Sequence, residues 1–178
     1  MAIVPRPPGP RPAWYGRLPA SLQRVAAQSD RVSSLPLRAG PPLRAAVATL
    51  PDVLTVGRAP EVQALAQRIA DGVCVALRVP SVRVRVALRR PPTRSGELHG
   101  LYTPTGGRGY DEVTVWMLTA KRGNVVAYKT FLRTLLHELC HHFDYTFLRL
   151  RDSLHTQGFY QRESSLFSAL GAAEVDLR

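Results

Sequence analysis

The spacing of apolar residues changes near residue 80 and separates a predicted helix from a predicted strand. Over residues 60–77 apolar side chains recur every three or four positions, which is typical of a helix with one buried face. Pro60 suits the first helical turn, where no N–H donor is needed, and Pro80 ends the pattern. Residues 82–89 then alternate between apolar side chains and, mostly, arginine. This alternation predicts a half-buried strand with a basic outer face.

Two more strands are predicted after the first. Residues 97–103 and 112–117 carry strand-like patterns, and a Gly-rich turn at residues 106–109 lies between them. A short connection of this kind favours antiparallel pairing. We therefore expect a small antiparallel or mixed sheet.

A long apolar-periodic helix is predicted to follow the sheet, over about residues 125–150, with Asn124 as its N-cap. The helix is apolar on several sides, so it should run through the core. A break precedes a last helix over about residues 160–170. The order of elements predicts an α+β fold in which the small sheet packs on the long helix.

The N-terminal part of the chain has a different composition. Six prolines lie within residues 1–19, and several arginines accompany them. We expect residues 1–50 to form a partly disordered Pro/Arg-rich extension, with one or two short helices within 20–50. Residues 51–178 are predicted to form the folded domain.

Composition narrows the class of protein. Of 178 residues 45% are hydrophobic, which suits a globular domain, and no apolar stretch approaches the roughly 20 residues of a membrane helix. The first residues lack the apolar core of a signal peptide, and two cysteines cannot form a disulfide framework. We therefore expect a cytoplasmic protein that does not contact a membrane.

The net charge of +11 lies in the first two thirds of the chain. Residues 1–58 carry 8 basic and 2 acidic side chains, residues 59–128 carry 10 and 5, and residues 129–178 carry 6 and 6. A basic N-terminal half could bind DNA or another polyanion through its phosphates. No recognisable nucleic-acid-binding motif accompanies this charge.

The long helix carries an HExxH motif, His137-Glu138-Leu139-Cys140-His141. Residues four apart project from the same face of a helix, so His137 and His141 can bind one metal ion. Glu138 is then placed to act as general base, taking a proton from a water molecule that the metal makes acidic. The motif predicts a zinc hydrolase.

A catalytic zinc ion usually has a third protein ligand. We favour His155, because the break after the helix would let the chain turn back over the metal. Glu163 on the last helix is the alternative ligand. Asp144 shares the face of His137 and could orient a ligand histidine or pair with an arginine. His142 and Cys140 point away from the two histidines and are expected to be packed neighbours.

The chain resembles the zincin metallopeptidases in three segments: LLHELCHHFD at residues 135–144, EVTVWM at 112–117 and HTQGFYQRE at 155–163. A histidine after the motif helix, followed by an aromatic residue, is most similar to the SprT-like branch. The resemblance implies an α+β catalytic domain with Zn²⁺ on His137, His141 and His155. It also implies that an extended peptide substrate adds to the sheet edge, and that the substrate could be a DNA-bound protein.

Three other interpretations fit the same residues. The histidines could hold zinc without catalysis, or the chain could be a basic nucleic-acid-binding module. A deformylase would also use HExxH, but it needs an upstream cysteine ligand, and Cys74 lies inside the predicted helix over 60–77. Among these, a purely structural zinc site has no use for a carboxylate that is not a ligand, so Glu138 favours the peptidase.

Overall fold

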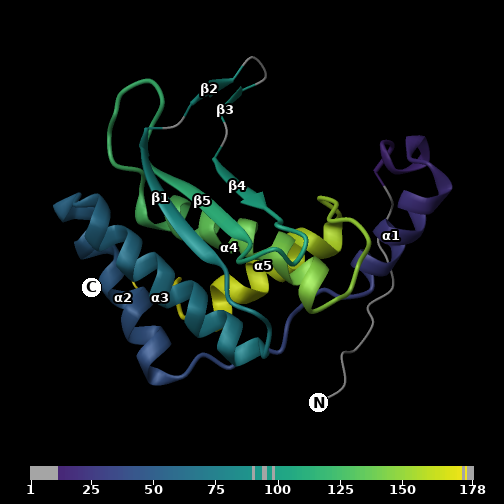
Figure 1. Cartoon of the computed structure of the whole chain (residues 1–178), viewed down its shortest axis with the longest axis horizontal. Helices are drawn as coiled ribbons and strands as arrows, with labels where there is room; N and C mark the ends of the chain where they lie inside the picture. The colour runs from purple at the N-terminus through teal and green to yellow at the C-terminus, as the bar shows by residue number, and fades with distance from the viewer. Residues whose placement is uncertain (1–11, 90, 94–95, 98, 174, 176–178) are drawn as a thin grey trace.

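The structure is a computed structural model that describes residues 12–89, 91–93, 96, 97, 99–173 and 175. Within these residues the fold is α+β, as predicted, with five α-helices and a small mixed sheet (Figure 1). The helices are α1 Ala20–Asp30, α2 Pro41–Val56, α3 Ala59–Leu77, α4 Tyr128–Thr146 and α5 Gln157–Ala169. The strands are β1 Arg83–Arg89, β2 Pro92–Thr93, β3 Gly96–Glu97, β4 Gly100–Thr103 and β5 Glu112–Leu118. None of the described helices is long and apolar enough to cross a membrane.

The three-stranded sheet has the order β1-β5-β4. Strand β5 runs parallel to β1 on one side and antiparallel to β4 on the other. The sheet is therefore mixed, because β4 comes back along the sheet before β5 inserts between it and β1. The predicted strand over 97–103 is divided between β3, which pairs with β2, and β4, which belongs to the main sheet.

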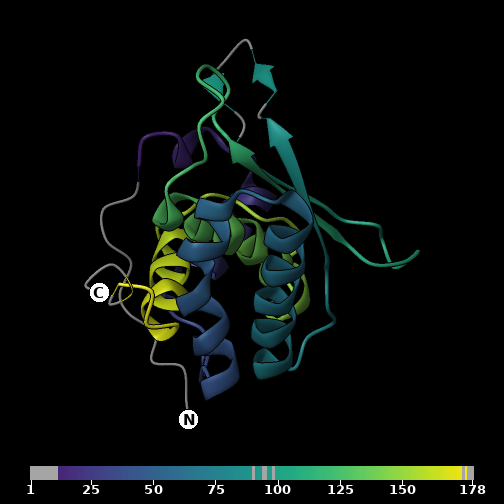
Figure 2. The same ribbon diagram turned by 90° about the vertical axis from the view of Figure 1, so that its left-hand side faces the viewer.

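The inner face of the sheet packs on helices. Val84 and Val86 of β1 and Val113 and Val115 of β5 are buried, while Arg83, Arg85 and Arg89 are exposed, as the alternation predicted. Helix α4 packs beneath β4 and β5, and α3 packs along β1. Figure 2 shows the helices gathered on one side of the sheet.

One edge of the sheet is covered by side chains of α3. The Val84 N–H donates to Gln67 Oε1 at 2.7 Å, and the Val86 N–H donates to Gln63 Oε1 at 3.1 Å. These glutamines satisfy backbone donors of β1 that would otherwise face solvent or a further strand. Strand β4 forms the other edge of the three-stranded sheet.

Residues before position 51 contribute to the same core as the rest of the chain. Helix α2 runs through the expected domain boundary at residue 50, and its Leu43, Val47, Leu50 and Leu54 are buried in the main hydrophobic cluster. Their helical spacing, together with the pair Pro41-Pro42 at the helix start, accounts for α2. Residues 1–11 of the expected extension lie outside the described residues.

Helix α4 begins later than predicted. Asn124 is not its N-cap; the cap position is Ala127, which offers no side-chain hydrogen bond. The cause is sheet pairing, because the Thr119 N–H donates to Asn124 O at 2.9 Å and the Val126 N–H donates to Met117 O at 2.8 Å. The backbone around Asn124 thus extends the end of β5 before the helix starts.

Truncation of Leu50 tests whether α2 belongs to the core. Leu50 is fully buried, so Leu50→Ala should lower the free energy of unfolding by about 2–5 kcal/mol, through lost burial and the cavity left behind. Val56→Ala, on the same helix at 60% exposure, should change it by less than about 0.5 kcal/mol. Chemical denaturation followed by circular dichroism measures both. Equal stabilities for Leu50→Ala and the wild type would show that α2 is not part of the core.

Candidate metal centre and catalytic site

Helix α4 places the HExxH residues beside the inner face of the sheet. Leu135, Leu136 and Leu139 are fully buried and hold the helix in the core. His137 and His141 are half-buried on a single face of α4, as their spacing predicted. The helix ends at Thr146, and Arg149 takes a left-handed conformation (φ 56°) as the chain turns back. The turn brings the following segment over the motif.

Three histidine nitrogens converge at one point. His155 Nε2 lies 2.9 Å from His137 Nε2 and 3.1 Å from His141 Nε2. One ligand atom from each histidine lies within 4.8 Å of the others, which is close enough for a single metal ion. Nitrogens bound tetrahedrally to one zinc ion at about 2.0–2.1 Å are about 3.3 Å apart. The donor set therefore fits zinc.

The partners of the opposite ring nitrogens assign the tautomers of two histidines. His137 Nδ1 lies 3.1 Å from Glu163 Oε2, and a carboxylate can only accept, so Nδ1 carries the proton. His141 Nδ1 lies 2.7 Å from Ser153 Oγ, whose own proton is donated to Asp144 Oδ2 at 2.8 Å. His141 Nδ1 must therefore donate as well. Both Nε2 atoms then present lone pairs to the shared point, where a cation would relieve their repulsion.

Electrostatics keep two of the rings neutral. Burial, followed by the neighbouring His137 and His155, lowers the pKa of His141 to about 3. Burial and His137 likewise lower the pKa of His155, while Glu163 opposes this shift. Neutral imidazole is the form that binds a metal, so His141 and His155 are in the ligand form at neutral pH.

Glu163, the alternative third ligand, lies behind His137. Its Oε2 contacts His137 Nδ1 at 3.1 Å, and its Oε1 is 3.5 Å from Arg133 Nη1. It is absent from the group of three converging side chains, which consists of His137, His141 and His155. The geometry gives Glu163 the part of orienting His137, a common partner arrangement for metal-binding histidines.

Asp144 both orients a histidine and pairs with an arginine, the two roles that the sequence had left as alternatives. Its Oδ2 accepts from Ser153, which contacts His141, so Asp144 orients that histidine through one intervening hydroxyl. Its Oδ1 accepts from Arg162 Nη2 at 2.7 Å, and both partners of this ion pair are fully buried. The helical spacing from His137 pointed to Asp144, but no sequence pattern predicted that Ser153 and Arg162 would be its partners.

Glu138 lies between α4 and β4, and Gly100 makes room for it. A Cβ atom at position 100 would lie 2.6 Å from Glu138 Cγ and 2.8 Å from Cδ, closer than atoms can approach. Burial raises the pKa of Glu138 to about 7, although His137 and the Tyr102 N–H lower it. A carboxylate with a pKa near 7 suits proton transfer at neutral pH. A glycine within a strand pattern was the available signal for Gly100.

Phe159 is a buried ring shared by the three histidines. Its centroid lies 4.9 Å from that of His137, 4.7 Å from that of His141 and 5.1 Å from that of His155. Tyr160 stacks on His155 on the other side, with centroids 5.9 Å apart, and is half exposed. Phe159 therefore limits how far any of the imidazole rings can tilt.

The remaining polar candidates lie outside the group of three histidines. His142 contacts Pro80 O through Nε2 at 2.8 Å and Asp111 Oδ2 through Nδ1 at 3.3 Å, so its ring is held away from the three nitrogens. Cys140 and Cys74 are buried in the hydrophobic core, as expected for packed thiols. The structure gives neither thiol a place beside the three histidines.

A cavity of about 550 Å³ opens over the site. The residues that line it include His137, His141, His155, Glu138 and Glu163, together with residues of strand β4. The other lining residues are His99, Gly100, Leu101, Tyr102, Pro104, Arg133, Thr134 and Tyr145. The converging nitrogens and the buried carboxylate are thus accessible to a substrate.

Comparisons with family models, with curated proteins and with solved structures gave no match to this chain.

Burial should make both thiols unreactive. It raises the pKa of Cys74 to about 12 and that of Cys140 well above its ordinary value. At pH 8 an exposed cysteine is partly ionised and is alkylated, whereas these two should stay thiols and resist iodoacetamide. Intact mass spectrometry should show no adduct on the native protein and two after unfolding in guanidinium chloride. Modification of the native protein at pH 8 would contradict the buried placement.

Proposed function

We propose that the chain is a zinc-dependent peptidase of the zincin type. The observation that carries this proposal is the convergence of His137, His141 and His155 beside Glu138, a carboxylate that is not part of the ligand group. A closed structural zinc site has four protein ligands and leaves no position for a substrate. Here three side chains converge under an open cavity, which is typical of a catalytic site.

His137, His141 and His155 would hold the zinc ion. When bound, zinc lowers the pKa of water and polarises a carbonyl oxygen. Glu138 lines the same cavity, and its carboxylate would accept the proton released from the nucleophile. The Tyr102 N–H and the close packing of Gly100 hold this carboxylate in place before substrate arrives.

Strand β4 gives the cavity a binding edge for an extended peptide. It is an edge strand of the three-stranded sheet, and its residues Gly100, Leu101 and Tyr102 line the cavity. A peptide that pairs with an edge strand gains main-chain hydrogen bonds without depending on its sequence. We propose that the substrate lies along β4 with its scissile bond above the three histidines.

A basic nucleic-acid-binding module is the second candidate, and one observation favours it. Arg83, Arg85 and Arg89 are exposed together on the outer face of β1. Such a row could bind phosphates through charge alone. The same three arginines would also suit a peptidase whose substrate is a protein bound to DNA, because they could bind the DNA.

Metal analysis of ligand variants tests the zinc site. Wild-type protein should carry about one zinc ion per chain by inductively coupled plasma mass spectrometry, and His155→Ala should carry none. Glu163→Ala should keep the ion but bind it about 10–100-fold more weakly, because Glu163 orients His137 without being a ligand. If only Glu163→Ala lost its zinc, Glu163 would be the third ligand and His155 would not. A wild type that takes up no zinc would favour the nucleic-acid-binding module.

Catalysis is tested separately on Glu138 with quenched fluorescent peptide libraries. Glu138→Gln keeps the side chain's size and should keep zinc, but it cannot accept a proton. The cleavage rate should fall by about 10²–10⁴-fold. Cleavage at the wild-type rate by a zinc-loaded Glu138→Gln protein would exclude Glu138 as general base.

Gly100→Ala tests the packing of β4 against Glu138. The added Cβ must displace the carboxylate, and a misplacement of about 1 Å costs about 10²-fold in rate. Zinc content should stay at the wild-type level, because the atoms nearest to the added Cβ belong to Glu138 and not to the three histidines. Thr103→Ala, at an exposed position on the same strand, is the control and should cleave like the wild type. An active Gly100→Ala enzyme would contradict the assigned packing.

A further inference from the structure

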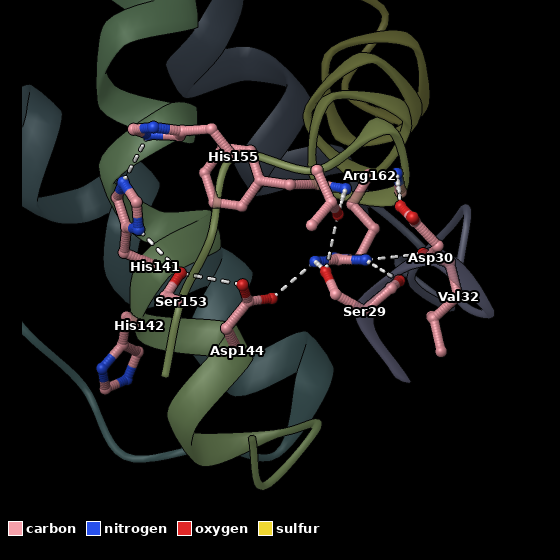
Figure 3. A network of polar contacts seen from close by, with 12 residues as sticks. Ser29, Asp30, Val32, His141, His142, Asp144, Ser153, His155 and Arg162 are labelled. Atoms are coloured by element: carbon pink, nitrogen blue, oxygen red, sulfur yellow. Dashed lines mark hydrogen bonds and ion pairs between the residues drawn. The ribbon is translucent and has the colours of Figure 1, made fainter. Parts of the chain in front are cut away.

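The C-terminal end of α1 meets the metal centre at the buried guanidinium of Arg162. Arg162 Nη1 donates to Ser29 O at 2.8 Å and to Val32 O at 2.7 Å, and Nη2 donates to Ser29 Oγ at 2.9 Å. Carbonyls at the end of a helix lack partners within the helix, and a cation is favourable there. Figure 3 shows this guanidinium lying between α1 and Asp144.

One chain of contacts runs from Arg162 to His141. Arg162 Nη2 donates to Asp144 Oδ1 at 2.7 Å, Ser153 Oγ donates to Asp144 Oδ2 at 2.8 Å, and His141 Nδ1 lies 2.7 Å from Ser153 Oγ (Figure 3). In this series of contacts the Asp144 carboxylate can only accept, so Arg162 and Ser153 donate to it, and His141 Nδ1 donates to Ser153. The orientation of the His141 ring therefore depends on where α1 holds Arg162.

A second set of contacts runs from α1 to the segment that carries His155. Ser29 Oγ and Thr156 Oγ1 are 2.9 Å apart, and Thr156, the residue after His155, is the N-cap of α5. The Gly158 N–H donates to Asp30 Oδ1 at 2.7 Å. Gly158 is packed so closely on α1 that a Cβ atom there would lie 2.7 Å from Asp30 Cα.

We propose that Ser29 and Asp30 of α1 are positioning residues of the metal centre, which hold His141 and His155 at the distance that one ion requires. This inference rests on the proposed zinc site. His155 belongs to neither a helix nor a strand, and Thr156 and Gly158, which follow it, are held by polar contacts to a distant segment. The contacts described come from α1, more than a hundred residues earlier in the chain.

The full-length chain with single substitutions tests the proposal. Ser29→Ala removes the hydroxyl that contacts both Arg162 and Thr156, and Asp30→Ala removes the acceptor of the Gly158 N–H. Asp30→Asn keeps a carbonyl oxygen as acceptor and is the conservative rescue. Ser21→Ala, at an exposed position on α1, is the matched control. The readouts are the zinc dissociation constant by chelator competition, the visible spectrum of the Co²⁺-loaded protein, and the apoprotein's Tm.

Loss of a residue that supports metal ligands typically weakens metal binding about 10–100-fold. We expect Ser29→Ala and Asp30→Ala to raise the zinc dissociation constant by at least about tenfold and to weaken the tetrahedral Co²⁺ bands. Asp30→Asn and Ser21→Ala should match the wild type in both. If Ser29→Ala does not fold, the comparison of Asp30→Ala with Asp30→Asn decides the matter, because Asp30 is only partly buried.

Two results would overturn the positioning role while leaving the zinc site intact. In one, both variants bind zinc like the wild type although their Tm falls, so that α1 supports the fold alone. In the other, Asp30→Asn loses as much affinity as Asp30→Ala, so that the hydrogen bond to Gly158 is not the cause. A wild type without zinc affinity would overturn this inference and the proposed function together.

Discussion

The buried ion pair between Asp144 and Arg162 is the interaction on which the arrangement of the site depends. Both side chains are fully buried, at 0% exposure. Removing one partner of such a pair costs about 3–5 kcal/mol, because the other is left as an unpaired charge. The pair joins α4 to α5, and the carbonyls of Ser29 in α1 and of Val32, two residues after α1 ends, also accept from Arg162. These three parts of the chain, α4, α5 and the end of α1, are thereby held in one relative position.

Neutral polar groups around the pair form most of its remaining hydrogen bonds. Among the buried side-chain nitrogen and oxygen atoms of the described residues, only Arg162 Nε has no hydrogen-bond partner, and the centroid of the Phe159 ring lies 5.9 Å from the guanidinium carbon. The same ring contacts the imidazoles of His137, His141 and His155. The polar network behind the site and the aromatic ring beneath it therefore constrain the histidines from two directions.

The local part of this arrangement could be predicted from the sequence. A helical period places His137 and His141 on one face, and alternation identifies the inner and outer faces of β1. These features depend on neighbours within a few residues. The structure confirms the α+β fold and brings His155 to the other two histidines, whereas zinc binding and peptide hydrolysis stay predictions.

The parts that could not be predicted depend on contacts between distant segments. The N-cap expected at Asn124 loses its place because β5 pairs with that backbone. The boundary expected near residue 50 falls inside α2, whose Leu50 is buried in a core that α2 shares with α3 and α4. Glu163 and Ser153 acquire their contacts to histidines only when α5 and the preceding turn fold back.

The glutamines that cover β1 also restrict how this molecule can associate with others. An open strand edge is a template for pairing with any extended chain, including a second copy of the same protein. Gln63 and Gln67 occupy the Val84 and Val86 donors, so strand addition at β1 would first have to break two hydrogen bonds. Within the described part of the chain, strand β4 has no such glutamines on its edge, although its Tyr102 N–H already donates to Glu138. Intermolecular pairing is thereby directed to the edge beside the cavity, and the opposite edge is protected against aggregation.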